Sequence, residues 1–149
     1  GLIAGSTELL GKEAPSRAKR VLKKDDILIS SVEGSLDKVA LVQKEHEGFL
    51  ASTGFFQLRS TTLLPEALLV IFKSLILQLQ LQQHCAGTIL TAVPKEAIKK
   101  LFIPILPVSI QETITALVAK SHESNKKAKD LLDEAKLKVE EIIEKGGAK

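Results

Sequence analysis

Small and apolar residues recur alternately four and three positions apart near the end of the chain, which predicts a long helix with a coiled-coil seam. The seam runs through Ile114, Val118, Ser121, Asn125, Ala128, Leu132, Ala135, Val139 and Ile142. A helix over residues 109–145 extends about 55 Å, longer than a domain built from the rest of the chain. We therefore expect it to pair with another helix through Ile114, Val118, Ala128, Leu132, Ala135, Val139 and Ile142. A surface helix packed on its own domain is the alternative.

Both ends of this helix carry sequence signals. Pro107 stops the preceding segment, and Ser109 with Glu112 forms a Ser-x-x-Glu pattern that predicts a capping box. Gly146 and Gly147 predict the end of the helix. The outer face mixes lysine with aspartate and glutamate, which does not indicate a nucleic-acid-binding tail.

Two polar residues interrupt the first half of the seam. A buried asparagine at a seam position costs stability but fixes register and orientation. Ser121 and Asn125 are therefore either a weak point of the pairing or a device for its specificity, and the pattern leaves both interpretations open.

The first sixty residues read as strands and loops. Compact apolar or alternating runs bounded by glycine and polar turns predict strands. They fall at residues 26–32, 38–43, 49–51 and 55–59. The first two flank the turn at Glu33-Gly34-Ser35, so we expect them to be neighbours in one sheet.

Helical segments follow the strands. Pro65 at a first helical turn opens a predicted buried helix that reaches about Gln83. Its apolar face consists of Leu68, Leu69, Phe72, Leu75, Ile76 and Leu79. A small-residue loop is expected at 86–89, a short helix at 94–101, and an extended exit at 103–107.

These elements predict an α+β fold, with a small twisted β-sheet domain and packed helices followed by a long coiled-coil-forming helix. We expect one domain over 1–108 and a long dimerisation helix over 109–147. Its 149 residues, 44% hydrophobic and 26% charged, suffice for one domain plus this extension. The chain begins with Gly and contains no Met, so we interpret it as a fragment.

Composition also restricts location and chemistry. Charged and polar residues interrupt the apolar stretch at 63–81, so it is not expected to span a membrane. The single cysteine, Cys85, excludes an internal disulfide and a thiolate-rich zinc site, and no secretory signal opens the chain. We expect a cytoplasmic protein.

Catalytic patterns are not visible in the sequence. There is no glycine-rich loop of the kind that binds the phosphates of a dinucleotide or a nucleoside triphosphate. There is also no Pro-Pro dipeptide of the kind that an adenine methyltransferase uses beside the flipped base. His46, His84 and His122 are dispersed without ligand spacing, and Cys85 has no neighbouring histidine. We expect no catalytic residue, no metal and no cofactor. With no Trp or Tyr, the chain also lacks the usual stacking platforms for single-stranded nucleic acid.

A basic cluster precedes the strand that begins at Asp26. Arginine can read guanine bidentately, lysine neutralises phosphate, and hydroxyl groups add hydrogen bonds. The candidate DNA-binding residues, expected in a loop, are Ser6, Thr7, Lys12, Ser16, Arg17, Lys19 and Arg20. A net charge of +3 and two adjacent aspartates leave a solvated surface as the alternative.

The order of these motifs resembles the specificity subunits of type I restriction-modification systems. The likeness begins at Gly5-Ser6-Thr7-Glu8-Leu9-Leu10 and continues through Asp25-Asp26-Ile27-Leu28-Ile29-Ser30, Ala51-Ser52-Thr53-Gly54-Phe55, the Ala86-Gly87-Thr88 loop, and Ile103-Pro104-Ile105-Leu106-Pro107 with Gln111. It covers nearly the whole chain, as the rear part of one target-recognition domain plus one spacer helix. Asp25 stands where the family commonly has glycine, and Val108-Ser109-Ile110 replaces its usual Pro-Leu-x-Glu.

The resemblance implies a non-catalytic DNA-reading subunit that positions adenine methyltransferase subunits, with a restriction and translocation subunit joining them. Two antiparallel spacer helices would hold two recognition domains apart on a bipartite duplex target. A chain with one such helix would achieve this by pairing with itself, and a homodimer would read a palindromic target. Two alternatives remain: the recognition fragment of a single-chain adenine methyltransferase, and a coiled-coil scaffold without DNA affinity.

Overall fold

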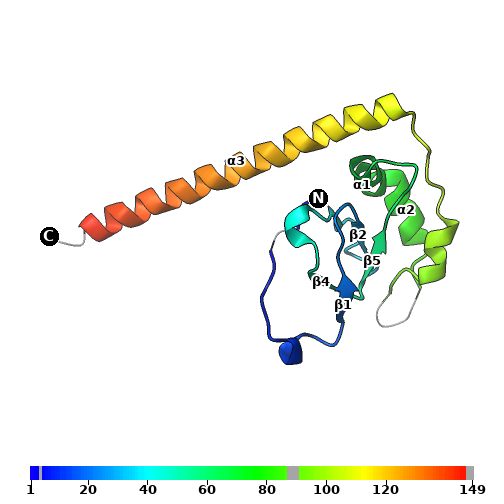
Figure 1. The fold of residues 1–149 in the computed structure, drawn as a ribbon, viewed down its shortest axis with the longest axis horizontal. Helices are drawn as coiled ribbons and strands as arrows, with labels where there is room; N and C mark the ends of the chain where they lie inside the picture. The colour runs from blue at the N-terminus through cyan, green and yellow to red at the C-terminus, as the bar shows by residue number, and fades with distance from the viewer. Residues whose placement is uncertain (4, 87–90, 147–149) are drawn as a thin grey trace. The chain divides into compact units, whose positions relative to one another are not determined.

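The computed structural model describes residues 1–3, 5–86 and 91–146 (Figure 1). The chain divides into two compact units, Gly1–Thr115 and Ala116–Lys149. The first unit carries two small antiparallel sheets with short helices, and the second continues the long C-terminal helix. The expected α+β class is confirmed.

Among the described residues of the first unit, five short strands form two sheets. In the three-stranded sheet, β2 (Ile27–Ser30) lies between β3 (Val39–Leu41) and β5 (Phe55–Leu58), antiparallel to both. The second sheet pairs β1 (Ala18–Val21) with β4 (Leu50–Ser52). The four predicted strand positions are confirmed, and so is the pairing of β2 with β3. The division into two sheets differs from the single sheet that we expected.

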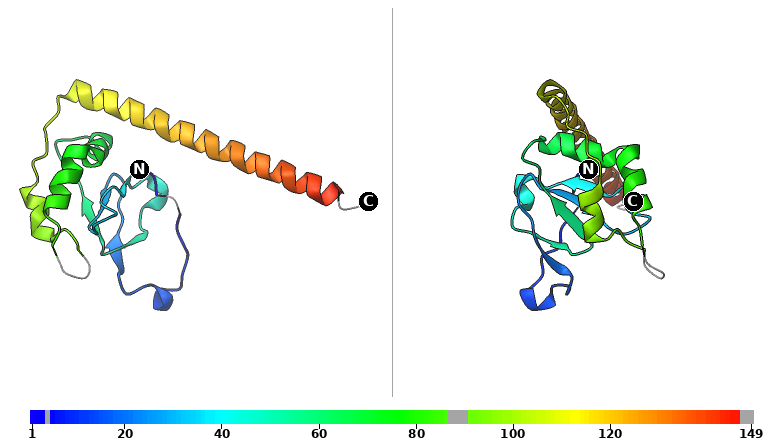
Figure 2. Two further views of the ribbon diagram at one scale, coloured as in Figure 1. Left: turned by 180° about the vertical axis from the view of Figure 1, so that it is seen from behind. Right: turned by 90° about the vertical axis from the view of Figure 1, so that its right-hand side faces the viewer.

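The central strand β2 is buried at every position. Successive side chains of a strand point to opposite faces, so a continuous apolar run of this kind needs cover on both faces. Helix α1 (Pro65–Lys73) packs against β2 and β3 (Figure 2). Leu28 packs with Leu22 and Val42 in a separate buried cluster.

The helix predicted from Pro65 to Gln83 is broken at Ser74 into α1 and α2 (Leu75–Gln83). Ser74 is extended, with φ −67° and ψ 147°, and its hydroxyl accepts from the Leu77 N–H at 3.5 Å, as a cap residue does. The expected burial is confirmed for Leu68, Leu69 and Phe72 in α1. The break rotates the apolar face of α2, where Leu77 and Leu81 are buried. The expected burial was wrong for Leu75, Ile76 and Leu79, which are exposed.

Three 3-10 turns complete the first unit: η1 (Gly11–Glu13), η2 (Lys44–His46) and η3 (Lys95–Lys100). The last of these confirms the short helix expected at 94–101. The small-residue loop expected at 86–89 lies, apart from Ala86, outside the described residues.

The long helix α3 spans Val108–Gly146 and confirms the predicted helix. It begins one residue earlier than expected, because Pro107 O accepts the N–H of Gln111 at 3.1 Å. Ser109 therefore lies inside the first turn and is not the cap residue. Its carbonyl accepts from Thr113 Oγ1 at 2.9 Å. Gly147, the second glycine of the predicted stop, lies outside the described residues.

A buried glutamine joins the start of α3 to the first unit. Gln111 is 3% exposed. Its Oε1 accepts the N–H of Leu64, the residue before α1, at 2.7 Å, and its Nε2 donates to Leu106 O at 2.8 Å. This side chain satisfies backbone groups at the start of α1 and in the exit segment, which would otherwise lack partners.

From Ala116 to Gly146, α3 has no buried residue among those that the structure describes. Its described ion pairs join lysine to glutamate or aspartate one turn away, as in Lys127–Glu123 at 2.7 Å and Lys138–Glu134 at 2.6 Å. Within the described residues, no helix combines the length and apolar character that a bilayer crossing requires.

Candidate nucleic-acid interface

The basic segment that we expected to be a loop is partly a strand. Residues Ala18–Val21 form β1 and pair with β4, with an irregularity between Ala18 and Arg20. The strand alternates, so that Lys19 and Val21 are exposed while Ala18 and Arg20 are half-buried. The expected loop conformation is wrong for this stretch, because pairing with β4 overrides the weak strand propensity of adjacent cations.

Arg17 lies just before β1 and is held across the turn between β4 and β5. Its Nε donates to Thr53 Oγ1 at 3.4 Å, and its carbonyl accepts the Thr53 N–H at 2.8 Å. A Cβ added at Gly54 would lie 3.1 Å from Arg17 Nη2, so glycine leaves room for the guanidinium. The guanidinium is exposed, and among the described residues only its Nε is hydrogen-bonded, so its other donors can reach an external acceptor.

Arg20 is in a different environment. It is half-buried, and its Nε is covered by protein without a hydrogen-bond partner among the described residues. A buried unpaired donor costs free energy. Arg17 and Lys19 are therefore the more accessible cations of this segment.

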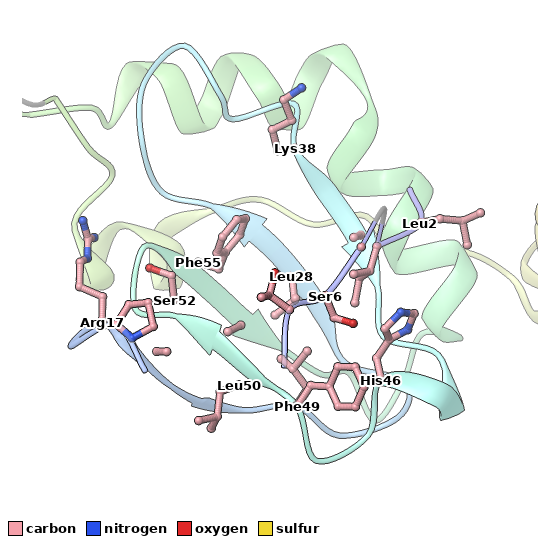
Figure 3. Close-up of a pocket in the computed structure, with 18 of the residues that line it drawn as sticks. Leu2, Ser6, Arg17, Leu28, Lys38, His46, Phe49, Leu50, Ser52 and Phe55 are labelled. Atoms are coloured by element: carbon pink, nitrogen blue, oxygen red, sulfur yellow. The ribbon is translucent and has the colours of Figure 1, made fainter. Parts of the chain in front are cut away.

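One open cavity of about 1320 Å³ brings together part of the predicted set (Figure 3). Ser6, Thr7, Ser16 and Arg17 line it, together with apolar side chains such as Leu28, Phe49 and Phe55. In the view of Figure 3, Arg17 and Ser52 lie toward one side of the cavity, and Ser6 and Leu28 lie toward its middle. The remaining predicted residues, Lys12, Lys19 and Arg20, do not line this cavity. DNA contact by these residues stays a prediction.

A buried carboxylate, which we did not single out from the sequence, fixes the end of β1. Asp26 is 4% exposed and accepts from Lys23 N at 3.1 Å, Gln57 Nε2 at 2.6 Å and Arg59 Nε at 2.9 Å. The same Gln57 amide donates to Val21 O at 2.9 Å. Asp26 and Gln57 thus link the two sheets. The apolar run after Asp26 was the available signal, since a carboxylate leading into a buried strand needs partners.

Asp25 adopts a left-handed conformation, with φ 69°. Glycine enters this region freely, and aspartate is among the few other residues that tolerate it. The position at which the chain departs from the family's glycine is therefore one where the backbone favours glycine. With aspartate in place of glycine, the turn keeps its conformation at a small cost in conformational free energy.

Groups that could support catalysis are dispersed in the part of the chain that the structure describes. No cluster of His, Cys, Asp and Glu side chains there could hold a metal ion. Burial, with a smaller contribution from the charge of Glu33, raises the pKa of the Cys85 thiol, which disfavours the reactive thiolate. His46 packs edge-on against Phe49 with ring centroids 5.8 Å apart.

The predicted helix-pairing residues divide by exposure. Ile114 and Val118 are half-buried, whereas the later residues are exposed. Leu132, Val139 and Ile142 are 56%, 56% and 70% exposed. Exposed apolar side chains aligned along one helix indicate an interaction surface. Pairing itself stays a prediction.

Comparisons with known proteins identify the relatives of this chain. No family model and no curated protein matches it. Among solved structures, the HsdS subunit from Thermoanaerobacter tengcongensis is 31% identical over 91% of this chain, with a TM-score of 0.71. A chain from a structure described as the basis of complex assembly and conformational transition of the type I R-M system is 30% identical over 99%, with a TM-score of 0.70. This chain spans 35% of the first relative and 39% of the second. The chain is therefore homologous to part of the HsdS specificity subunits of type I restriction-modification systems, as its motifs indicated.

Proposed function

We propose that this chain is a DNA sequence-specificity subunit, or half of one, in a type I restriction-modification complex. In this role it recognises a bipartite duplex target and positions adenine methyltransferase subunits, and it carries no catalytic residue itself. The observation that carries the proposal is the similarity to an HsdS subunit along 91% of this chain.

The first unit provides the surface for DNA. Arg17 and Lys19 are exposed next to the hydroxyls of Ser16 and Thr53, a combination that suits phosphate oxygens and guanine edges. Ser6 and Thr7 line the same cavity as Arg17. We assign Lys12 to phosphate neutralisation from its exposed position on η1, and Arg20 to a supporting position.

The long helix provides the surface for protein partners. Its exposed apolar residues suit a second helix, and its outer face carries charges of both signs that keep it solvated. We assign residues 1–108 to recognition and 109–147 to the spacer. Methyltransferase and restriction subunits complete the proposed complex, and the cell interior is the proposed location.

Adenine methylation mapping tests this function. The chain is produced in cells with its modification subunit, and methylated adenines in the host DNA are located. We expect one bipartite motif, palindromic if the chain pairs with itself and non-palindromic if two different recognition domains act together. Arg17→Ala should reduce methylation or relax one base of the motif.

Two results would contradict the proposal. Folded, associated proteins that methylate no adenine would remove the specificity role and leave the scaffold interpretation. Methylation by the product of the complete gene in the absence of any modification subunit would instead indicate that the chain is the recognition fragment of a single-chain adenine methyltransferase. Lys127→Ala serves as the matched control, because Lys127 is an exposed cation already paired with Glu123.

A further inference from the structure

The seam of α3 has a polar centre, formed by Ser121 and Asn125. Both residues are exposed. Apolar seam residues lie on both sides of this centre: Val118 toward the start of the helix is half-buried, and Leu132 toward its end is 56% exposed. The order of apolar, polar and apolar segments along the seam is therefore the same whether the helix is read from its N-terminus or from its C-terminus.

We infer that this polar centre marks the twofold axis of an antiparallel pair formed by α3 and the α3 of a second copy of this chain. The inference rests on the self-pairing proposed above and adds its register. Seam residues alternate between heptad positions a and d, and in an antiparallel coiled coil an a residue of one helix faces a d residue of the other. Only registers that place a residues opposite d residues are therefore candidates.

When the twofold axis lies at the polar centre, the two seam residues that face each other have similar polarity in each of the three pairs around the axis. Ser121 faces Asn125 of the second copy, and Asn125 faces its Ser121, so these polar groups can hydrogen-bond to each other. Val118 then faces Ala128, and Ile114 faces Leu132 of the second copy. Polar groups meet polar groups, and apolar groups bury apolar groups, which is what a desolvated seam requires.

The register shifted by one heptad is chemically worse. It sets Asn125 against Ala128 and Ser121 against Leu132, so two polar side chains would be buried against apolar ones. An unpaired buried polar group opposes association. A polar seam residue thus selects one register over its neighbour.

The same register carries the last turns of one helix beyond the start of the other, because Val139 of one copy falls opposite Pro107 of the second copy. The side chains in these last turns, Ile142 and Ile143, are 70% and 67% exposed. The described register therefore pairs the helices from Val108 to about Lys138.

Cysteine cross-linking tests the register in the full chain. The background is Cys85→Ser, which removes the free thiol. The double variant Ile114→Cys with Leu132→Cys should form disulfide-linked dimers under mild oxidation, because a disulfide needs Cα atoms about 4.4–6.8 Å apart. Ile114→Cys with Val139→Cys, the pair expected from the shifted register, should cross-link at least tenfold more slowly. Ile114→Cys or Leu132→Cys alone should not form dimers, since symmetry mates are far apart.

Circular dichroism confirms that each variant is folded, and sedimentation of the cysteine-free chain measures association independently. Faster cross-linking of the 114/139 pair overturns the register but leaves self-pairing intact. A dimer in which neither pair cross-links overturns the register as well. A chain that sediments as a monomer overturns both this inference and the proposed self-pairing, while methylation mapping still tests the specificity role.

Discussion

The two units of this protein use apolar residues in opposite ways. In Gly1–Thr115, side chains such as Ile27, Ile29 and Phe72 have no exposed surface, and a buried carboxylate fixes the position of β1. In Ala116–Lys149, no described residue is buried, and most apolar side chains are exposed, as Leu132 shows at 56%. The first unit gains its stability from an internal core, whereas the second exposes apolar surface of the kind that marks an interaction site.

This difference separates stability from association. A substitution in the core of the first unit should change its free energy of unfolding, and a substitution on the seam of α3 should change its affinity for another helix. Four substitutions test this separation.

The largest effect is expected from Phe72→Ala in the first unit. Phe72 is fully buried in α1, so its truncation should lower the free energy of unfolding by about 3–5 kcal/mol through lost burial and a cavity. Urea denaturation followed by circular dichroism measures this. Phe102→Ala is the control, because Phe102 is 84% exposed and should change stability by less than about 0.5 kcal/mol. Equal losses for both variants would contradict the assigned core.

Leu132→Asp should weaken helix pairing without unfolding the first unit. A charge placed in an apolar seam is desolvated on association, so we expect a loss of about 2–3 kcal/mol in association free energy. Sedimentation velocity measures the change. Leu137→Asp is the matched control, since Leu137 is similarly exposed, at 60%, but lies off the seam. Unaltered association of Leu132→Asp would show that the seam is not the interface.

Arg17→Ala tests whether the first unit contacts the DNA. Loss of one base contact should cost about 1–3 kcal/mol of binding free energy and relax preference at one position. Fluorescence anisotropy with the assembled complex and duplex DNA measures it. Lys127→Ala in the second unit should leave binding within about 0.5 kcal/mol of the unsubstituted chain, because its charge is already paired. The reverse pattern would move the DNA contact to the helix.

The smallest effect should come from Asp25→Gly, which restores glycine at a left-handed position. We expect a gain of about 0.5–1 kcal/mol in the stability of the first unit, because removal of the Cβ relieves backbone strain at φ 69°. Gly34→Ala gives the opposite test at φ 78° and should lose about 1 kcal/mol. Thermal unfolding compares both with the unsubstituted chain. A destabilised Asp25→Gly would mean that the aspartate side chain stabilises the turn more than its backbone opposes it.

Local patterns were sufficient where each element has its own signal. The apolar run of β2 predicts a strand, and the heptad of α3 predicts a helix, because each depends on the order of neighbouring residues. The break at Ser74 was missed because apolar periodicity continues across it, although serine is a good cap residue. Local signals therefore placed the elements better than their boundaries.

Contacts distant in sequence were beyond such patterns. β1 forms because β4 pairs with it, and its basic residues give little indication of a strand. The Asp26 cluster brings in Gln57 and Arg59 from β5 and just after it. Thr53 and Gly54 orient Arg17 through the turn between β4 and β5, and their part in the motif gave no indication of this contact. Candidate residues such as Arg17 could be named from sequence, but the contacts that support them in the fold could not.

The alternation along β1 also has an evolutionary consequence. Ala18 and Arg20 face the protein, so replacing them disturbs packing, whereas Lys19 and Val21 face solvent. Exposed positions of this kind accept most replacements within about 0.5 kcal/mol of stability. The backbone of β1 stays in place because Gln57 holds Val21 O and β4 pairs with the strand. Mutation can therefore vary what the outer side of β1 presents while the fold that presents it is inherited unchanged.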